Sequence, residues 1–301
     1  MDFIQLNAMA KINLGLDVLR KRPDGYHEVR MIMQTVHIYD RLQLNKSEES
    51  GIVLSTKQRF LPTNESNLAY KAAKLLMDEF GITDGLQISL QKNIPVAAGM
   101  AGGSADAAAV LMGVNKLFEL GLSSQELMER GVTIGADVPY CILGGTALAE
   151  GIGEKLTCLP EMPECSILVV KPAINVSTKF VYENLRANEL PPKAHADIDT
   201  QLAALEQGDL KKLSLAMGNV LQTVTEPVHS IIGELKEFMK NHGALNAMMS
   251  GSGPTVFGLY DEEEAAKGAY WKLRMAYPDF QIFLTRPCGG TEITEAEGDR
   301  Q

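Results

Sequence analysis

The sequence predicts an α+β protein with two lobes. Its 301 residues are enough for two domains of ordinary size. Runs with alternating apolar residues cluster in the first third and again near the end, instead of alternating regularly with helices. Pro160 and Pro163 mark a boundary between the two regions. We therefore expect an N-terminal domain over residues 1–160, a C-terminal domain over 161–290 and a frayed polar tail over 291–301.

The N-terminal region reads mainly as strands, with turn residues in "RKRPDGYH" and "NKSEESG" between the first three. A helical period begins at Asn67, a plausible N-cap, and ends at Gly81. In chain order the patterns predict strands at 3–19, 28–44 and 51–57, a helix at 67–80, a strand at 85–95, helices near 104–119 and 124–134, an apolar segment at 135–145, and a strand at 146–156.

The C-terminal region begins with a short buried strand and continues with helices. Its last part reads strand, strand, helix, strand. The predicted elements are a strand at 166–172, helices at 177–187, 199–206, 209–216 and 227–241, strands at 244–251 and 255–260, a helix at 262–277 and a strand at 280–287.

Composition excludes several classes of function. The formal net charge of −10 argues against a general binder of nucleic acid or anionic membrane, because such proteins need a surplus of Lys and Arg. If the substrate is a polyanion, the positive electrostatic potential that attracts it must be local to the site. Backbone N–H groups are able to supply that potential. The four cysteines indicate packing residues of a reducing compartment, and there is no signal-peptide pattern or run of about 18 apolar residues. We expect a cytoplasmic monomer or homodimer.

A glycine-rich segment lies directly before a predicted helix in "NIPVAAGMAGGSADAAAV". We call residues 95–103 the glycine loop. The first N–H groups of a helix lack intrahelical partners, and glycines let a phosphate approach them. Ser104 is placed to cap the helix or to touch a phosphate oxygen or a metal ion. The segment matches neither a Walker A loop nor G-x-G-x-x-G, so a tight turn that only lets the helix pack closely remains the alternative.

Two isolated charges stand in apolar surroundings. Asp137 lies in "TIGADVPYCILGG" and Lys11 lies in "AMAKINLGL". Because an unpaired buried charge is costly, such residues have a partner or a chemical role. If they meet, Lys11 would hold Asp137 ionised beside a substrate hydroxyl. The alternatives are that Asp137 caps a helix or turn and that Lys11 lies on the exposed face of an edge strand.

A further cluster of small residues lies between two apolar runs in "MMSGSGPTVFGLY". We call residues 250–253 the serine–glycine turn. A tight β-turn and a second loop that closes over phosphates or substrate are both consistent with this pattern.

Three segments together, "AMAKINLGL", "PVAAGMAGGSADAA" and "MSGSGPTVF", resemble the GHMP kinase superfamily of small-molecule kinases in their order and separation. The resemblance covers nearly the whole chain. Within the superfamily, "R-x-DGYH" followed by "GADVP" is similar to members that phosphorylate a cytidine diphosphate-linked methylerythritol in the non-mevalonate isoprenoid pathway. The implied fold has an N-terminal ribosomal-protein-S5-like lobe, a C-terminal α+β lobe and an active site between them.

The resemblance also implies roles for individual residues. Asp137 would be the general base for the C2 hydroxyl of the substrate, and Lys11 would position it and stabilise charge. The cofactors would be ATP and Mg²⁺, with the ion held mostly by nucleotide oxygens and water. Asp106 departs from an easy match, because it would repel phosphates unless it faces away or reaches a metal ion. The implied ATP contacts are Asn67, Leu68, Lys92, Pro95, Ala97, Ala98, Gly99, Met100, Ala101, Gly102, Gly103 and Ser104.

A cytosine ring offers two π faces and a hydrogen-bonding edge, so aromatic side chains and a polar reader suffice to bind it. The resemblance assigns Tyr26 and His27 to one face and the edge, and Tyr182 to the other face. The alternatives are a core-packed Tyr182 and a plain turn histidine at His27. The other implied substrate contacts are Asn13, Asp137, Thr178, Gly251 and Ser252.

Two other functions remain open from the sequence. One is a different GHMP kinase that acts on mevalonate, homoserine or a sugar. That function does not explain the presence of "DGYH" together with Tyr182. The other is a non-catalytic ligand sensor on the same scaffold, and the intact Lys11 and Asp137 argue against it.

Overall fold

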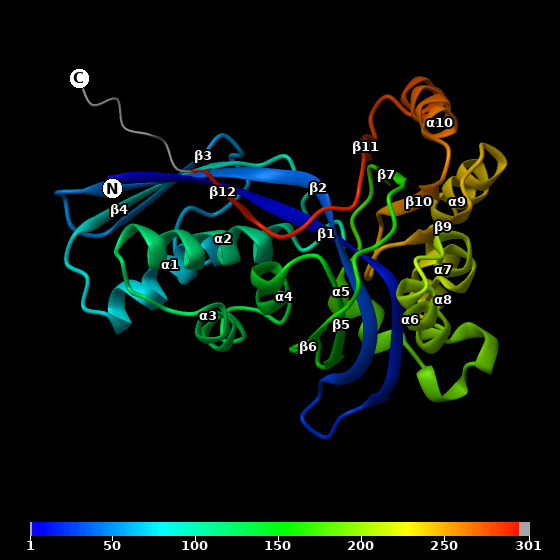
Figure 1. Cartoon of the computed structure of the whole chain (residues 1–301), viewed down its shortest axis with the longest axis horizontal. Helices are drawn as coiled ribbons and strands as arrows, with labels where there is room; N and C mark the ends of the chain where they lie inside the picture. Colours follow the sequence, from blue (N-terminus) through cyan, green and yellow to red (C-terminus); the bar gives the residue numbers. More distant parts are fainter. Residues whose placement is uncertain (1, 295–301) are drawn as a thin grey trace.

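The computed structural model describes residues 2–294, which form an elongated molecule of two lobes (Figure 1). The elements of the first part are, in order, β1 (Phe3–Lys21), β2 (His27–Ser47), β3 (Ile52–Thr56), α1 (Leu68–Glu79), β4 (Gly85–Gln91), α2 (Gly102–Leu117), α3 (Ser124–Gly131), α4 (Val138–Leu143), β5 (Thr146–Gly151) and β6 (Lys155–Cys158). Those of the second part are β7 (Ser166–Lys171), α5 (Thr178–Asn184), two 3₁₀ turns (Ala187–Glu189 and Pro192–Ala194), α6 (Ile198–Glu206), α7 (Leu210–Ala216), β8 (Gly218–Asn219), α8 (Gln222–Val228), α9 (Ile231–Asn241), β9 (Asn246–Met249), β10 (Val256–Tyr260), α10 (Glu263–Ala276), β11 (Gln281–Thr285) and β12 (Glu292–Thr294).

The N-terminal lobe is built on a sheet in the order β12-β1-β2-β4-β3, with β5 and β6 continuing from β2 and β8 pairing with β1. The long strands β1 and β2 pair antiparallel over almost their whole length, with shifts in register between Met9 and Ala10 and between Asn13 and Gly15. Such bulges bend a strand pair and increase its twist. In Figure 1 the two strands run along this lobe and then turn down beside the second one. One strand pair therefore reaches both lobes.

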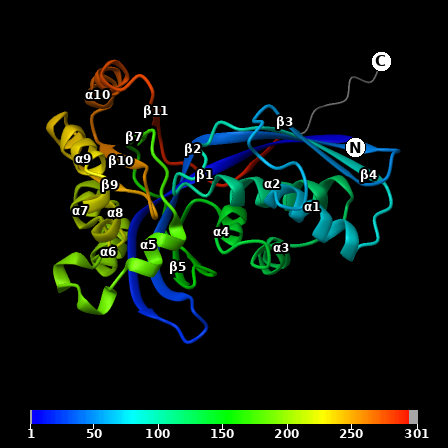
Figure 2. The ribbon, with the colours of Figure 1, turned by 180° about the vertical axis from the view of Figure 1, so that it is seen from behind.

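Helices α1 and α2 cover one face of this sheet, and α2 contacts β1 directly (Figure 2). The alanines of α2 make this close approach possible, since Ala105, Ala107, Ala108 and Ala109 are fully buried. At Gly113 an added Cβ would lie 2.9 Å from Leu44. The packing of small residues therefore places the start of α2, with the glycine loop before it, beside β1.

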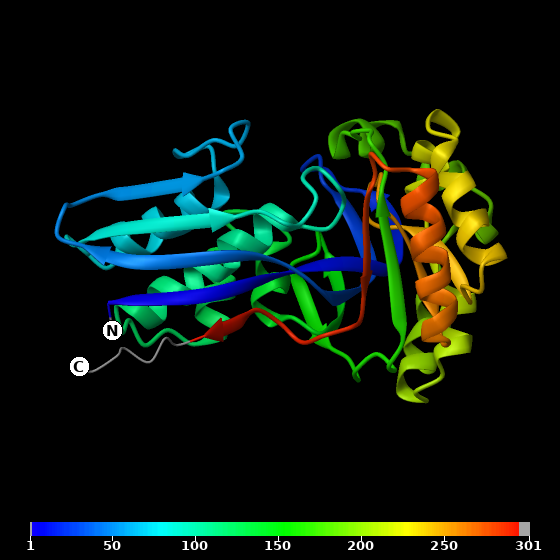
Figure 3. The same cartoon turned by 90° about the horizontal axis from the view of Figure 1, so that it is seen from above.

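The C-terminal lobe contains an antiparallel sheet in the order β11-β7-β10-β9. Helices α9 and α10 pack on this sheet (Figure 3). Strand β10 is buried along its whole length, as expected of an inner strand that carries Val256, Phe257 and Leu259. The serine–glycine turn precedes β10, so the core of this lobe fixes its position.

The chain then returns from the C-terminal lobe to the first sheet, and we call residues 286–294 the return segment (Figure 3). Its Pro287 forms a bridge with Val36, the Cys288 N–H donates to the carbonyl of Thr35 at 3.0 Å, and β12 pairs antiparallel with β1. The expectation of a frayed tail is therefore wrong for Glu292–Thr294, because their backbone groups pair with an open strand edge. The remainder of that tail, 295–301, lies outside the described residues.

Most predicted elements are confirmed within a few residues of their bounds, and the α+β class with two lobes is confirmed. The differences include the following three. The helix predicted at 227–241 begins at Ile231, and a separate helix, α8, precedes it and contains Pro227. The strand predicted at 146–156 is split into β5 and β6 by a turn that contains Gly153 at φ +109°. The segment 135–145, which had no predicted element, contains α4.

Two expectations drawn from the composition, on the cysteines and on membrane spans, can be compared with the structure. Cys158 is exposed, so the packing role expected of it is wrong, whereas Cys141 is buried in the core. Among residues 2–294, no helix combines the length and the apolar character needed to cross a membrane.

The return segment supports α4 through a contact between two glycines. Gly144 and Gly145 both have φ +70°, but only Gly144 lies against the return segment, where an added Cβ would come 2.2 Å from the Cα of Gly290. We expect Gly144→Ala to lower the free energy of unfolding by about 3 kcal/mol, the sum of backbone strain and a steric clash. Gly145→Ala carries the strain alone, because no atom lies within 4 Å of its added Cβ. Equal losses for the two variants in chemical denaturation would show that the contact with Gly290 contributes nothing.

Candidate active site

A cavity of about 1200 Å³ lies between the lobes, bounded by the glycine loop, the start of α1, the residue before α4, and α5. It is lined by most of the residues that the sequence singled out: Lys11, Tyr26, His27, Asn67, Leu68, Lys92, Pro95, Ala97, Ala98, Gly99, Ala101, Gly102, Gly103, Ser104, Asp137, Thr178, Tyr182, Gly251 and Ser252. The other two, Asn13 and Met100, are fully buried behind its wall. Segments far apart in the chain thus meet around one space.

The glycine loop adopts a strained conformation before α2. Ala97, Gly99 and Ala101 have φ of +52°, +72° and +56°, in the left-handed region that non-glycine residues rarely occupy. Ala101 stands at the N-cap position of α2 and offers no side-chain cap. Because the helix begins at Gly102, Ser104 lies inside its first turn, and the alternative in which Ser104 caps the helix is wrong. The positive end of the α2 dipole is therefore open to an anion in the cavity.

Asp137 and Lys11 meet at the cavity wall. The Lys11 ammonium lies 3.8 Å from a carboxylate oxygen of Asp137 and donates to the Asn13 amide oxygen at 2.8 Å. Lys11 is only 5% exposed, and its backbone pairs with Thr35 of β2 on one side and with Met100 on the other, so its alternative placement on an exposed edge strand is wrong. Asp137 occupies the N-cap position of α4, but its side chain makes no capping hydrogen bond. The carboxylate is one-third exposed and remains available to a ligand.

The strand of Lys11 is tied to the glycine loop. The Lys11 N–H donates to the carbonyl of Met100 at 3.2 Å. Met100 itself is buried, so its contribution here is a backbone acceptor and a core side chain. The position of the Lys11–Asp137 pair is therefore set relative to the loop by main-chain contact.

Beneath the start of α2 lies a buried ionic cluster of three residues. The Lys92 ammonium contacts Asp40, and it donates to Asp106 at 2.6 Å. Asp40 also accepts from the N–H groups of Asn93 at 2.5 Å and Ile94 at 2.8 Å, whereas one oxygen of Asp106 has no partner. Asp106 therefore faces a lysine. Its charge is balanced within the protein.

Burial and the neighbouring charges shift the pKa values in this cluster. Burial lowers the pKa of Lys92, but the carboxylates of Asp106 and Asp40 outweigh it and hold that pKa above its usual value. Burial raises the pKa of Asp106 well above its usual range, against the attraction of Lys92. The ammonium is thus firmly charged, and the Asp106 carboxyl protonates more readily than an ordinary aspartate does.

Aromatic residues gather at the other end of the cavity. The rings of His27 and Tyr182 have centroids 5.1 Å apart and are tilted by 40°. Burial and the nearby Lys21 lower the pKa of His27, so its ring is neutral near pH 7 and keeps one acceptor nitrogen. Tyr26 is 60% exposed at the tip of the β1–β2 hairpin. This end offers π faces and an uncharged polar edge.

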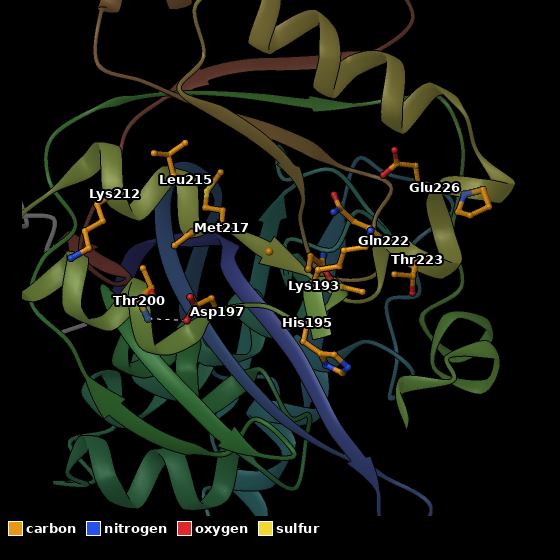
Figure 4. Close-up of a pocket in the computed structure, with 15 residues that line it drawn as sticks. Lys193, His195, Asp197, Thr200, Lys212, Leu215, Met217, Gln222, Thr223 and Glu226 are labelled. Carbon is orange, nitrogen blue, oxygen red and sulfur yellow. Dashed lines mark hydrogen bonds between the residues drawn. The ribbon is translucent and has the colours of Figure 1, made fainter. Parts of the chain in front are cut away.

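A second cavity, of about 890 Å³, opens in the C-terminal lobe between α6, α7 and α8 (Figure 4). It contains none of the residues predicted from the sequence. Its lining includes Lys193, His195 and Gln222, and the charge of Glu226 is balanced by Lys236 at 2.7 Å. Asn219 lines this cavity, and its amide donates to the carbonyl of Gly251 on the wall of the first one. The serine–glycine turn thus lies between the two cavities.

Sequence reasoning missed three residues that organise the site. Asp40 is a lone acid in the apolar run "VHIYDRLQL", the same signal that drew attention to Asp137. Ser250 was noticed only as a member of the serine–glycine turn. Asn219 carries no local signal, since its role comes from contacts with residues about 30 positions away.

Comparison with known proteins places this geometry in a family. The model of the GHMP kinases N-terminal domain matches residues 67–145, and that of the GHMP kinases C-terminal domain matches 201–279. The chain is 54% identical over 286 residues to a 4-diphosphocytidyl-2-C-methyl-D-erythritol kinase of Lachnoclostridium phytofermentans, covering 95% of this chain and 98% of the relative. It is 50% identical over 290 residues to the enzyme of the same name from Clostridium perfringens, covering 96% and 100%.

Solved structures give the same picture. A crystal structure of 4-(cytidine 5'-diphospho)-2C-methyl-D-erythritol kinase matches with a TM-score of 0.81 at 32% identity, covering 95% of this chain and 100% of that one. A homoserine kinase from Cytophaga hutchinsonii matches with a TM-score of 0.79 at 20% identity, covering 98% of each chain. The second likeness concerns the fold alone.

Proposed function

The chain belongs to the GHMP kinase family and, within it, to the 4-diphosphocytidyl-2-C-methyl-D-erythritol kinases, and from this premise we propose how its residues carry out the reaction. It is an ATP-dependent kinase that phosphorylates the 2-hydroxyl of 4-diphosphocytidyl-2-C-methyl-D-erythritol in the non-mevalonate isoprenoid pathway. The observation that carries the proposed assignment of residues is the Lys11–Asp137 pair, 3.8 Å apart, at a cavity that the glycine loop also lines.

The triphosphate of ATP lies over the glycine loop in this proposal. The N–H groups at the start of α2 and the helix dipole stabilise its negative charge. This local stabilisation is needed because the net charge of the chain is −10, so the overall electrostatic field of the protein does not attract an anion. Asn67 and Leu68, at the start of α1, line the part of the cavity that receives the adenosine. Asn67 has its amide committed to capping α1 and to the carbonyl of Pro62, which fixes this wall.

Magnesium would accompany the nucleotide and neutralise charge on its phosphates. The residues that the structure describes contain no group of three His, Cys, Asp or Glu able to hold a metal ion. A site with few protein ligands is compatible with Mg²⁺ in a kinase, because that ion keeps several waters and binds mainly through substrate phosphates. The hydroxyl of Ser104, at the cavity wall in the first turn of α2, is a protein oxygen that would face it.

Asp137 is the proposed general base. Its carboxylate would accept the proton of the acceptor hydroxyl as the oxygen attacks the γ-phosphorus, while the bond from that phosphorus to the β–γ bridging oxygen breaks and ADP leaves. Lys11 orients the carboxylate, 3.8 Å away, and stabilises negative charge that develops between the two substrates. Because Asn13 accepts a hydrogen bond from Lys11, the ammonium is held in one orientation. Positioning and charge stabilisation thus supply most of the catalysis.

The acceptor's cytidine would bind at the aromatic end. Tyr26 and Tyr182 would cover the faces of the base, and the neutral His27 would read its edge. Thr178 and Ser252 share a hydrogen bond of 2.8 Å beside this end and would contact the acceptor with Gly251. We also propose that the enzyme acts in the cytoplasm as a monomer or homodimer, without nucleic-acid or membrane partners.

A coupled assay of ADP release tests the substrate assignment. With ATP and magnesium, kcat/KM for the cytidylated methylerythritol should exceed that for methylerythritol phosphate, mevalonate or homoserine by at least about 10²-fold, because the uncytidylated alcohols leave the base-binding end empty. Equal rates for the acceptors with and without the cytidine diphosphate group would contradict the assignment. Binding of the acceptor with no ADP release from ATP would favour a ligand sensor.

Removal of one aromatic face tests the cytidine site. Tyr182→Ala should raise KM for the cytidylated acceptor by about 10-fold or more, with a smaller change in kcat, since base stacking is worth ~1–3 kcal/mol per base. Phe180→Ala is the matched control, because Phe180 lies on the same helix, is 48% exposed and does not line the cavity. An unchanged KM in Tyr182→Ala would leave that residue with only a packing role.

A further inference from the structure

The serine–glycine turn makes direct contact with the glycine loop through one buried hydroxyl. Ser250 is fully buried, and its hydroxyl donates to the carbonyl of Gly99 at 3.0 Å. The same oxygen accepts from the N–H of Asn13 at 3.3 Å. One side chain therefore joins the loop proposed to hold ATP with the strand that carries Lys11.

The two backbones also touch without side chains between them. At Gly99, where φ is +72°, an added Cβ would lie 2.3 Å from the carbonyl oxygen of Ser250. At Gly251, where φ is +56°, it would lie 3.2 Å from the carbonyl oxygen of Gly99. Because close-packed backbones transmit displacement, a shift of the glycine loop must move the serine–glycine turn.

The far side of the turn faces the proposed acceptor site. The Ser252 hydroxyl shares a hydrogen bond of 2.8 Å with that of Thr178 at the start of α5, the helix that carries Tyr182. Asn13, which donates its N–H to Ser250, also holds the Lys11 ammonium through its side chain. The contacts of the turn thus reach both the acceptor-binding helix and the catalytic pair.

Hydrogen bonds from the C-terminal lobe hold the four residues of the turn in one conformation. The Asn219 amide donates to the carbonyls of Met249 and Gly251, both at 2.8 Å, and the Thr225 hydroxyl donates to that of Ser252 at 3.3 Å. Within the turn, the Gly253 N–H donates to the carbonyl of Ser250 at 2.9 Å. A turn fixed in this way moves as a unit.

We propose that Ser250 is a positioning residue whose hydroxyl couples the binding of ATP to the binding of the acceptor alcohol. Occupation of the glycine loop by a triphosphate fixes the carbonyl of Gly99, and Ser250 passes this constraint to Asn13 and to the serine–glycine turn. Each substrate then binds to a site that the other has already ordered, which strengthens the binding of both. This inference rests on the proposed function.

The test measures the dissociation constant of a non-hydrolysable ATP analogue by calorimetry, with and without saturating cytidylated methylerythritol. Typical couplings are about 5- to 150-fold, so in the wild-type enzyme the acceptor should tighten nucleotide binding by about 5-fold or more. In Ser250→Ala this ratio should fall to within about 2-fold of one, while each substrate alone keeps an affinity within a few-fold of wild type. Turnover at saturation should also fall. Ser250→Cys, which keeps the shape with a weaker donor and acceptor, should give an intermediate ratio and serves if the alanine variant fails to fold.

Ser214→Ala is the matched control. Ser214 is as fully buried as Ser250, but its hydroxyl has no hydrogen-bond partner and lies in α7, away from both substrate sites. It should keep the wild-type ratio.

Three results would overturn the inference: a ratio near one in the wild-type enzyme, a wild-type ratio preserved in Ser250→Ala, or an equal loss of the ratio in Ser214→Ala. If the wild-type enzyme releases ADP with this acceptor while the ratio is one, the inference alone fails. Absence of acceptor binding and of ADP release removes the proposed function and the inference with it.

Discussion

Replacement of Asp137 by Asn should lower kcat with the cytidylated acceptor by about 10²-fold or more, because general-base catalysis typically contributes 10²- to 10⁴-fold. The amide has nearly the same shape as the carboxylate, but it does not accept the hydroxyl proton. The Asp137 side chain makes no capping hydrogen bond, so the substitution removes little from the stability of α4. KM for ATP should stay within about 3-fold of wild type, because the glycine loop and α2 supply the proposed phosphate contacts.

The loss belongs to the chemical step only if binding survives. Calorimetry with an ATP analogue and with the acceptor should therefore give near-wild-type affinities for Asp137→Asn. Asp279→Asn, at an exposed acid in the C-terminal lobe outside the cavity, is the matched control and should retain full turnover. A single-turnover rate for Asp137→Asn that equals the wild-type rate would remove Asp137 from proton transfer and leave it a charge that orients Lys11.

The sequence predicted the two-lobed α+β fold because its patterns are strong and local. The alternation in "FIQLNAMAKINLGLDVL" and the capped helix after Asn67 need no tertiary information, and both are confirmed. Strand β12 was missed because "TEIT" is short and polar, and only the open edge of β1 makes it a strand. Helix α4, which begins directly after Asp137, was missed because six residues give too little periodicity.

The same distinction applies to the site. Lone charges in apolar runs pointed to Lys11 and Asp137, whose proximity the structure then supplies. Asp106 has no clear role in the sequence because its partner, Lys92, lies just after β4, 14 positions away. Ser250 looked like an ordinary turn residue, since its value lies in contacts with Gly99 and Asn13 more than 150 positions distant. Contacts between residues that are distant in the chain leave no signal in the local sequence pattern.

Lys92→Met should lower the free energy of unfolding by about 3–5 kcal/mol, because it leaves buried carboxylates without their cation. Asp40 keeps its two backbone N–H donors, but Asp106 loses its lysine partner and already has one oxygen without a partner. Asp106 must then take up a proton in the folded state. Since burial raises its folded pKa well above the unfolded value, the variant should be destabilised progressively as the pH rises above about 4 and should recover stability as the pH is lowered again toward about 4.

Two further variants separate this mechanism from a general loss of packing. Adding Asp106→Asn to Lys92→Met removes the carboxyl that must protonate, so the double variant should be more stable at pH 8 than Lys92→Met alone and should lose most of the pH dependence. Lys74→Met breaks an exposed pair with Asp78 and should leave the unfolding curve almost unchanged. The opposite outcome would be a loss of unfolding free energy in Lys92→Met that does not depend on pH and that Asp106→Asn fails to relieve. That outcome would mean that Lys92 stabilises the region beneath the start of α2 through the packing of its aliphatic stem, and that the charges of the cluster contribute nothing to stability.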